Sequence, residues 1–331
     1  MGRVMAQPST ADRRAPGGFR LPWAFLVLVG LLVAGRFLLA PHLTHPALRT
    51  WATVFVAVCV QALPFLVLGV ALSAAITAFV PASFWTRALP RRTYAAVPVA
   101  GLAGAVLPGC ECASVPVASG LMARGVAPPA ALAFLLASPA INPIVLVATA
   151  VAFPDDPEMV VARFGASLAV AVLAGWFWAR FGRAAWLPVP RRTAEAGQGR
   201  AGAFVDTMRH DLLHAGGFLV VGALAAATLN VAIPRDWLTA VAGVPVVSVL
   251  VPAFLAVLLS ICSEADAFVA ASFTAFSPTA KLVFLVVGPM VDLKLIALQA
   301  GTFGRAFAWR FAPLTLVLAI AAGFAAGWVL L

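Results

Sequence analysis

The stretch of sequence that decides the fold lies at residues 107–143 and reads LPGCECASVPVASGLMARGVAPPAALAFLLASPAINP. It is mostly apolar, yet it contains two thiols, a carboxylate, an amide and several prolines. Proline breaks a helix and frees backbone polar groups. Inside a membrane such backbone is tolerated only within protein or beside a polar cavity, and ionisable side chains at that depth indicate function. We therefore predict that this stretch forms half of a buried binding site.

The rest of the chain has the composition of a membrane protein. Of its 331 residues, 63% are hydrophobic and 10% are charged, whereas a soluble domain contains about 25% charged residues. The net charge of +10 comes mainly from basic residues in short loops between apolar runs. That pattern indicates membrane topology and contact with anionic lipid rather than nucleic acid. We therefore predict an all-α polytopic membrane protein.

Apolar runs divide the chain into segments, since a transmembrane helix needs about 20 apolar residues. The runs are residues 21–40, 51–80, 95–122, 127–153, 160–179, 212–233, 241–276, 281–303 and 311–331. The N-terminus is arginine-rich and lacks a small-residue cleavage site, so we interpret it as a cytoplasmic tail rather than a cleaved signal. The predicted organisation is a cytoplasmic tail (1–20), an extra first transmembrane helix with its loop (21–50), a first repeat (51–179), a basic cytoplasmic linker (180–211) and a second repeat (212–331).

An internal repeat is suggested by motifs that recur in the same order at nearly the same spacing. Residues 62–69 read ALPFLVLG and residues 215–222 read AGGFLVVG. Further along, the aligned pairs are CEC at 110–112 with CSE at 262–264, and SPAIN at 138–142 with GPMVD at 288–292. Chance apolar similarity does not easily produce all of these matches in register.

The loop charges predict how the two repeats lie in the membrane. Cytoplasmic loops are enriched in Lys and Arg, which places the N-terminus and residues 81–94 and 180–211 inside, and the acidic residues 154–158 outside. The chain must then cross the membrane an odd number of times between residues 94 and 154. Two apolar runs lie in between, so one of them must enter and return, and we predict that residues 95–126 form this re-entrant hairpin. The same reasoning makes 241–277 a hairpin from the opposite face. Two inverted repeats with broken helices follow, an arrangement common in secondary transporters; a parallel repeat with full spans is the alternative.

The two hairpin tips and the two broken helices are predicted to converge near the middle of the membrane. The side chains expected there are Cys110, Glu111, Cys112, Ser114, Ser138, Asn142, Cys262, Ser263, Glu264, Asp266 and Asp292. Thiolates together with carboxylates suit a soft or borderline cation such as zinc, or a thiol-seeking metalloid. The candidate metal ligands are Cys110, Cys112 and Cys262, and the buried carboxylates could carry a coupling proton.

Simpler interpretations exist for several of these residues. Cysteine is often buried merely as a small hydrophobe, and for Cys59, alone in an apolar span, that interpretation is preferred. Asn142 could cap the half-helix that resumes after it, and Asp292 with Lys294 could be a structural pair near a helix break. His210 and His214 have the i, i+4 spacing of a metal pair but no third ligand accompanies them, so we interpret both residues as interfacial.

The same motifs resemble those of a known family. The runs PGCECASVP (108–116), FLLASPAINP (134–143), CSEADAF (262–268) and GPMVDLK (288–294) are similar to the bacterial predicted-permease family, which includes the organoarsenical efflux permeases. The resemblance covers roughly residues 50–330. It implies a permease of the bacterial inner membrane, often paired with a second small membrane protein, and it implies no particular substrate.

We therefore predict an inner-membrane permease rather than an enzyme. It would act as a secondary transporter or channel-like exporter and move a small solute, such as a metal ion or metalloid, through a midplane site between two repeats. No G-x-x-x-x-G-K-[ST] loop occurs, so any ATP-driven motor would be another chain. No cofactor is expected, and the expected partners are the solute and membrane lipid. The alternatives are a membrane thiol–disulfide oxidoreductase using Cys110 and Cys112, and a non-transporting subunit of a membrane complex.

Overall fold

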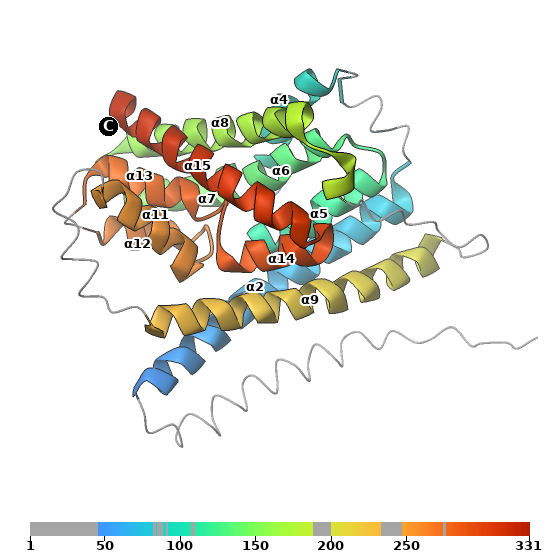
Figure 1. The fold of residues 1–331 in the computed structure, drawn as a ribbon, viewed down its shortest axis with the longest axis horizontal. Coiled ribbons are helices and arrows are strands. Elements are labelled where there is room, and N and C mark those ends of the chain that lie inside the picture. The colour runs from blue at the N-terminus through green and yellow to red at the C-terminus, as the bar shows by residue number, and fades with distance from the viewer. Residues whose placement is uncertain are drawn as a thin grey trace, which may run out of the picture. The chain divides into compact units, whose positions relative to one another are not determined.

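The protein is an assembly of helices in every part of the chain that the structure describes (Figure 1). In the computed structural model these parts are residues 46–81, 84, 89–90, 92–106, 110–187, 200–232, 247–273 and 276–331. They contain no strand, and five of their helical segments are long and apolar enough to cross a membrane. The composition therefore predicted the fold class correctly: the chain is an all-α polytopic membrane protein. The predicted tail (1–20) and first transmembrane helix (21–40) lie outside the described residues.

Within the described residues the helices form two series, and in each a long helix is followed by four short helices and a second long helix. The first series is α2 (Pro46–Phe79), α4 (Thr93–Gly104), α5 (Glu111–Ala123), α6 (Pro128–Ile141), α7 (Pro143–Ala152) and α8 (Pro157–Phe181). The second is α9 (Arg200–Ala232), α11 (Val247–Leu259), α12 (Asp266–Ala271), α13 (Pro278–Val287), α14 (Leu293–Phe303) and α15 (Arg305–Leu330). A 3-10 turn, η1 (Ala184–Trp186), follows α8. We call residues 46–181 the first half and residues 200–330 the second half.

Proline fixes where several helices begin. Pro128, Pro143, Pro157 and Pro278 stand at the first positions of α6, α7, α8 and α13. The missing N–H of proline costs nothing there, because the first N–H groups of a helix have no partner within it. The sequence between residues 200 and 211 contains no proline, and α9 already begins at Arg200. Part of the stretch predicted as a polar linker is therefore helix.

Both halves contain a helix that breaks and resumes at a polar cap. Between α6 and α7, the Asn142 side chain accepts a hydrogen bond from the Val145 N–H (3.0 Å). Between α13 and α14, Asp292 Oδ1 accepts one from the Leu295 N–H (2.6 Å). Each side chain thus satisfies a free N–H at the start of the resumed helix. The capping interpretation of Asn142 is confirmed, and both interruptions fall where the sequence motifs predicted them.

The long helices of the two halves pair in opposite directions. In Figure 1, α2 lies beside α9 and α8 beside α15, and the colour gradient shows each pair to be antiparallel. The short helices make contacts across the halves, α5 with α14 and α12 with α7. At a rise of about 1.5 Å per residue, α4, α5 and α11 are each too short to cross a hydrocarbon core of about 30 Å.

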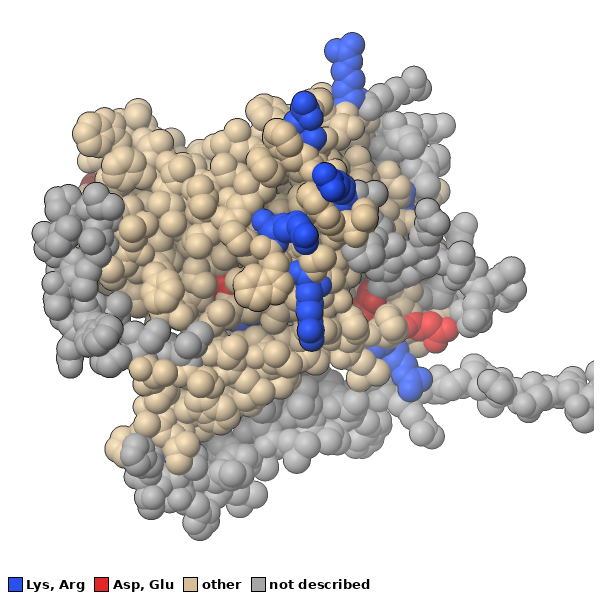
Figure 2. Space-filling view, viewed as in Figure 1, with Lys and Arg blue, Asp and Glu red and all other residues tan. Residues whose placement is uncertain are grey.

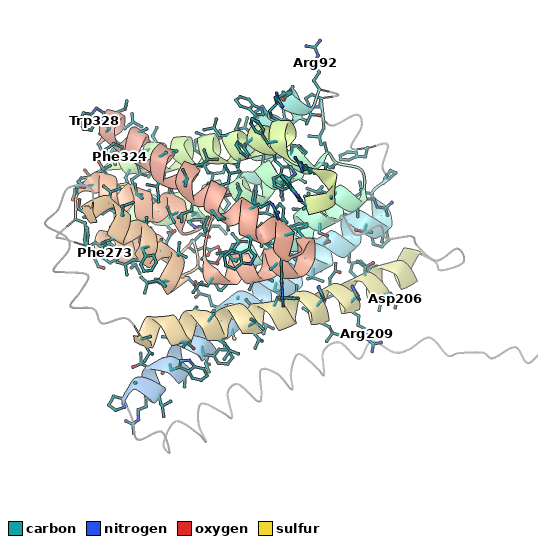
Figure 3. The ribbon with its side chains drawn as sticks, in the orientation of Figure 1. Arg92, Asp206, Arg209, Phe273, Phe324 and Trp328 are labelled. Carbon is teal, nitrogen blue, oxygen red and sulfur yellow. The ribbon has the colours of Figure 1, made fainter. Side chains whose placement is uncertain are left out.

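Basic side chains gather at one end of the helices. Figure 2 shows Lys and Arg concentrated over the region where α8 ends and α15 begins. The exposed arginines of the described helix ends there are Arg92, Arg180, Arg183, Arg209, Arg305 and Arg310. Figure 3 shows Arg92 and Arg209 far from Phe324 and Trp328 near the end of α15. Asp155 and Asp156 immediately precede α8 and Glu158 lies in its first turn, so these acidic residues lie at the end opposite the arginines.

Candidate functional site

Glu111 and Lys294 form a buried ion pair that joins the two halves. Lys294 Nζ lies 2.7 Å from Glu111 Oε1 and 3.3 Å from Asp292 Oδ2. None of the three side chains is more than 1% exposed. Because Glu111 begins α5 and Lys294 lies in the first turn of α14, the contact connects a short helix of the first half with the resumed helix of the second.

The positions of these charges follow from local helix structure. Glu111 stands at the N-terminus of α5, where the helix dipole stabilises a negative charge. Lys294 stands near the N-terminus of α14, where the dipole disfavours a positive charge. The lysine therefore depends on its two carboxylates. Asp292 has a double function, since one oxygen caps α14 and the other pairs with Lys294.

Three thiols lie beside this ion pair. The thiol of Cys110, the N-cap residue of α5, lies close to the thiols of Cys112 and Cys262. All three are buried and free. They come from both halves, as predicted, but within the described residues no group of three or more Cys, His, Asp or Glu has the geometry of a metal site. We call Glu111, Asp292, Lys294 and these three cysteines the Glu111 cluster.

A second buried group also joins the halves, and its centre is Arg163 on α8. Arg163 Nη2 lies 2.7 Å from Asp266 Oδ2, and Nη1 donates to Thr149 Oγ1 at 2.8 Å. Nη2 also donates to the Ser263 carbonyl at 3.4 Å. All four residues are buried. We call Arg163, Thr149, Ser263 and Asp266 the Arg163 cluster.

Glycines allow the long helices to approach the Glu111 cluster closely. A Cβ added at Gly69 on α2 would lie 2.4 Å from the Ala113 Cα on α5. A Cβ added at Gly222 on α9 would lie 2.7 Å from the Lys294 Cα on α14. Real Cβ atoms are not found at such distances, so only glycine fits without a shift of the backbone. The aligned pair Gly69 and Gly222 in the sequence thus marks the two helices that cover this cluster.

The other predicted site residues have local contacts. Ser114 Oγ donates to the Glu111 carbonyl in its own helix (3.0 Å), and the Ser138 carbonyl accepts from Asn142 Nδ2 (3.1 Å). Glu264 is half-buried and lies within electrostatic range of Glu111, Lys294 and Arg163. The structure therefore gathers the thiols and the carboxylates, while Ser114, Ser138 and Asn142 support the helix ends around them.

Sequence reasoning missed Arg163 and Thr149. The hydropathy of the run 160–179 predicts an apolar span, although the run contains an arginine. A charged residue well inside a transmembrane segment was the available signal, because such residues face the protein interior and find partners there. Lys294 was expected beside Asp292, which is correct, but its shorter contact is to Glu111.

The two clusters and Glu264 contain an excess of acidic groups. Four carboxylates (Glu111, Glu264, Asp266 and Asp292) face two basic side chains, Arg163 and Lys294. Three of the carboxylates have a buried oxygen without a hydrogen-bond partner, Glu111 Oε2, Glu264 Oε1 and Asp266 Oδ1, and Asp292 Oδ2 has only the 3.3 Å ion pair with Lys294. Buried charge of this kind is costly unless it is compensated. The arrangement can therefore accept positive charge.

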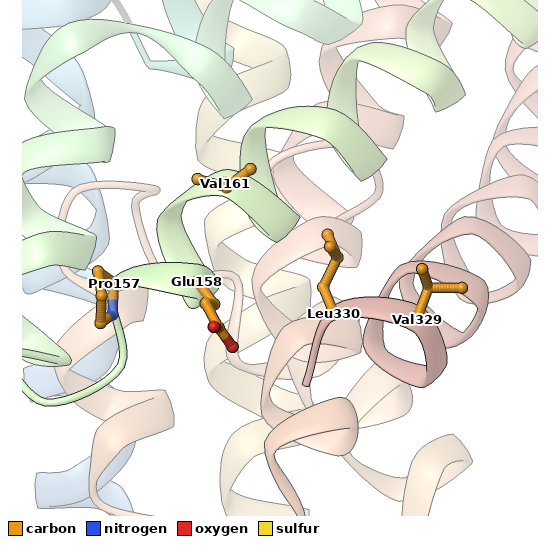
Figure 4. Close-up of a pocket in the computed structure, with 5 residues that line it drawn as sticks. All are labelled: Pro157, Glu158, Val161, Val329 and Leu330. Atoms are coloured by element: carbon orange, nitrogen blue, oxygen red, sulfur yellow. The ribbon is translucent and has the colours of Figure 1, made fainter.

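A surface cavity lies apart from both clusters. Its volume is about 380 Å³, and it is lined by Pro157, Glu158, Val161, Val329 and Leu330 (Figure 4). It contains none of the predicted site residues and is located where α8 begins and α15 ends. The candidate site is therefore the buried centre rather than this cavity.

A polytopic helical protein with broken helices and buried, partly uncompensated charges at its centre has the features of a permease. The chain belongs to the predicted permease family, whose model matches residues 47–328. It is 33% identical over 277 residues to UPF0718 protein YcgR of Bacillus subtilis (strain 168), covering 81% of this chain and 94% of that protein. It is 30% identical over 278 residues to a Streptococcus mutans serotype c protein named "Putative two-component membrane permease complex subunit", covering 82% and 92%. No solved structure matches the chain.

Proposed function

We propose that this permease is a secondary transporter of the bacterial inner membrane that moves a small cationic or thiol-reactive solute through the buried centre between its halves. The observation that carries the proposal is the acidic excess, four carboxylates against two basic side chains. Neutralising uncompensated buried charge requires cations or protons. A cationic solute would neutralise these carboxylates when it is bound, and protons that exchange with it would neutralise them when it is absent.

The thiols narrow the class of solute. Cys110, Cys112 and Cys262 lie in contact next to Glu111. Thiols favour soft or borderline cations such as zinc, and thiol-seeking metalloids, over magnesium or calcium. An oxyanion would meet more negative than positive charge in this centre. We therefore propose a metal ion or metalloid as the solute.

The arrangement of the helices supports an alternating-access mechanism based on inverted repeats. Corresponding helices of the two halves run antiparallel (Figure 1), and the cross-contacts of α5 with α14 and α12 with α7 are the pairs that a twofold axis in the membrane would generate. The arginine-rich end would face the cytoplasm, which also places the N-terminus there. The short helices around residues 105–110 and 260–265 would form the re-entrant hairpins.

A second small membrane protein is proposed as a partner. The Streptococcus mutans relative is named as a subunit of a two-component permease complex. Transport assays are therefore best made with the chain alone and after co-expression with membrane proteins encoded next to it. A requirement for such a protein would support a two-component permease.

The thiol contacts also favour a second candidate function, a membrane thiol–disulfide oxidoreductase. Cys110 touches two other thiols, so it could form a disulfide with either. To separate the two candidate functions, solute flux and thiol oxidation are each measured with and without Cys112. Reversible thiol oxidation coupled to electron transfer, without solute movement, would favour the oxidoreductase.

The proposed function is tested by solute flux in proteoliposomes. We expect zinc or arsenite flux in the wild-type protein and, if Glu111 binds solute or proton in transport, a loss of at least about tenfold in Glu111→Gln. Glu158→Gln, which changes an acidic residue in the surface cavity, is the matched control and should transport normally. Normal flux in Glu111→Gln would remove Glu111 from the mechanism. Failure of every cation and metalloid to move, with sulfate or phosphate transported instead, would reject the proposed solute class.

A further inference from the structure

Arg163 is an unusual residue for its position, because its charged side chain is completely buried in an apolar helix. The side chain is 0% exposed, and α8 is one of the segments able to cross a membrane. A buried guanidinium is costly unless it is paired with a counter-charge and hydrogen-bonded. Here one nitrogen donates to Thr149 and another contacts both Asp266 and the Ser263 carbonyl. Two of these three partners belong to the other half of the molecule.

Those two partners flank a turn that lies between helices. Residues 260–265 separate α11 from α12, and the turn is closed by hydrogen bonds from the Ala265 and Asp266 N–H groups to the Cys262 carbonyl (2.9 and 3.1 Å). Arg163 holds the turn at Ser263 and at Asp266. The segment has little regular structure of its own, so its position depends on contacts from outside.

The same segment is under backbone strain at its start. Ser260 has a φ of 48°, in the left-handed region that residues other than glycine rarely adopt. Its hydroxyl oxygen accepts a hydrogen bond from the Leu293 N–H (3.3 Å) at the start of α14. A strained conformation persists only where the surrounding structure determines it. The turn is thus fixed at one end by Ser260 and at the other by Arg163.

Cys262 is the residue of this turn whose side chain faces the other thiols of the Glu111 cluster. The Cys262 thiol lies close to the Cys110 thiol of the first half. Because Cys262 closes the turn that Arg163 holds, the position of the thiol is coupled to the guanidinium. We propose that Arg163 is a positioning residue that holds the Cys262 turn against Cys110 and so completes the thiol face of the transport site. This inference rests on the proposed function for its purpose, but its geometry can be tested independently.

The test is the rate of disulfide formation between Cys110 and Cys262 under a mild oxidant. The background is Cys59→Ser/Cys112→Ser, so that the two remaining cysteines report only on each other. Protein is reconstituted in lipid, and the disulfide is quantified by mass spectrometry after free thiols are alkylated. We expect Arg163→Gln to lower the rate at least about tenfold, because the rate of reaction between two groups depends strongly on their relative position. Arg163→Lys should restore part of the rate, since an ammonium cannot contact all three partners together.

Two controls separate positioning from general loosening of the fold. In the background Cys59→Ser/Cys262→Ser, the remaining thiols Cys110 and Cys112 lie on one helix end, and their rate should be the same with and without Arg163→Gln. Arg310→Gln changes an exposed arginine and should leave the Cys110–Cys262 rate unchanged. Should Arg163→Gln fail to fold, the double variant Arg163→Gln/Asp266→Asn removes both charges together and is interpreted in the same way.

A wild-type Cys110–Cys262 rate in a folded Arg163→Gln protein would overturn the proposal, and so would an equal loss for both thiol pairs. Loss confined to the Cys110–Cys262 pair would support it. The assay needs no transported solute, so it separates the two proposals. If no cation moves in the flux assay but cross-linking depends on Arg163, the proposed function fails and the positioning role remains.

Discussion

The two buried clusters have the same plan but different chemistry. Each pairs a carboxylate at the start of a short helix, Glu111 or Asp266, with a basic side chain from the other half. Lys294 places a compact charge between two carboxylates and leaves thiols and carboxylate oxygens beside it. Arg163 spreads its charge over three partners, one of them a backbone carbonyl. This difference is the basis of our proposal that the Glu111 cluster binds the solute and that the Arg163 cluster holds the structure around it.

The largest change in the free energy of unfolding is expected when Lys294 is removed from the Glu111 cluster. Lys294→Met leaves Glu111 and Asp292 buried without their cation, so we expect a loss of about 3–5 kcal/mol in the free energy of unfolding. Lys281, the other lysine of the chain, lies over the ring of Phe153 and is only half-buried. Lys281→Met is therefore the matched control, with a much smaller loss. Thermal unfolding in detergent measures both, and equal effects would mean that the buried pair has no special importance.

A smaller effect is expected from crowding the helix that covers the Glu111 cluster. Gly222→Ala places a methyl group against the α14 backbone at Lys294, and we expect a loss of about 1–3 kcal/mol from overpacking. Gly216→Ala on the same helix α9 is the control, because no atom lies near a Cβ there. It should be neutral or slightly stabilising, since alanine favours helix. Unfolding curves that rank the two variants in the opposite order would contradict the close approach.

The smallest effect is expected at the cap of the first broken helix. Asn142→Ala removes the bond to the Val145 N–H, and loss of an N-cap costs about 1 kcal/mol. Asp292→Ala removes the equivalent cap and also an ion-pair partner of Lys294, so it should cost more. Because Asn142→Ala also removes the hydrogen bond from Asn142 Nδ2 to the Ser138 carbonyl, the difference between the two losses is a lower bound on the contribution of the ion pair. A larger loss for Asn142→Ala would show that the two breaks are not equivalent.

The sequence predicted the local features well because their causes are local. Hydropathy gave the fold class, and the helix breaks at Asn142 and Asp292 followed from proline, glycine and capping residues close by in the chain. The gathering of Cys110 with Cys262 followed from the aligned motifs. The partner of Lys294 was not predictable in this way, because the repeat-equivalent residue of Lys294 is Ile144 and no pattern links it to Glu111. Arg163 was overlooked because one charge does not alter the average hydropathy of a long run.

Contacts between the halves have a consequence for assembly. The first half contributes Glu111 and Arg163, and the second half contributes Lys294 and Asp266, so each supplies the counter-charge that the other lacks. Either half alone would leave at least one buried ionisable group, Glu111 and Arg163 in the first half or Asp266 in the second, without its partner. The two halves therefore behave like the subunits of an obligate heterodimer that the peptide connection between them has made permanent. Their folding must be completed by docking, after both halves have entered the membrane.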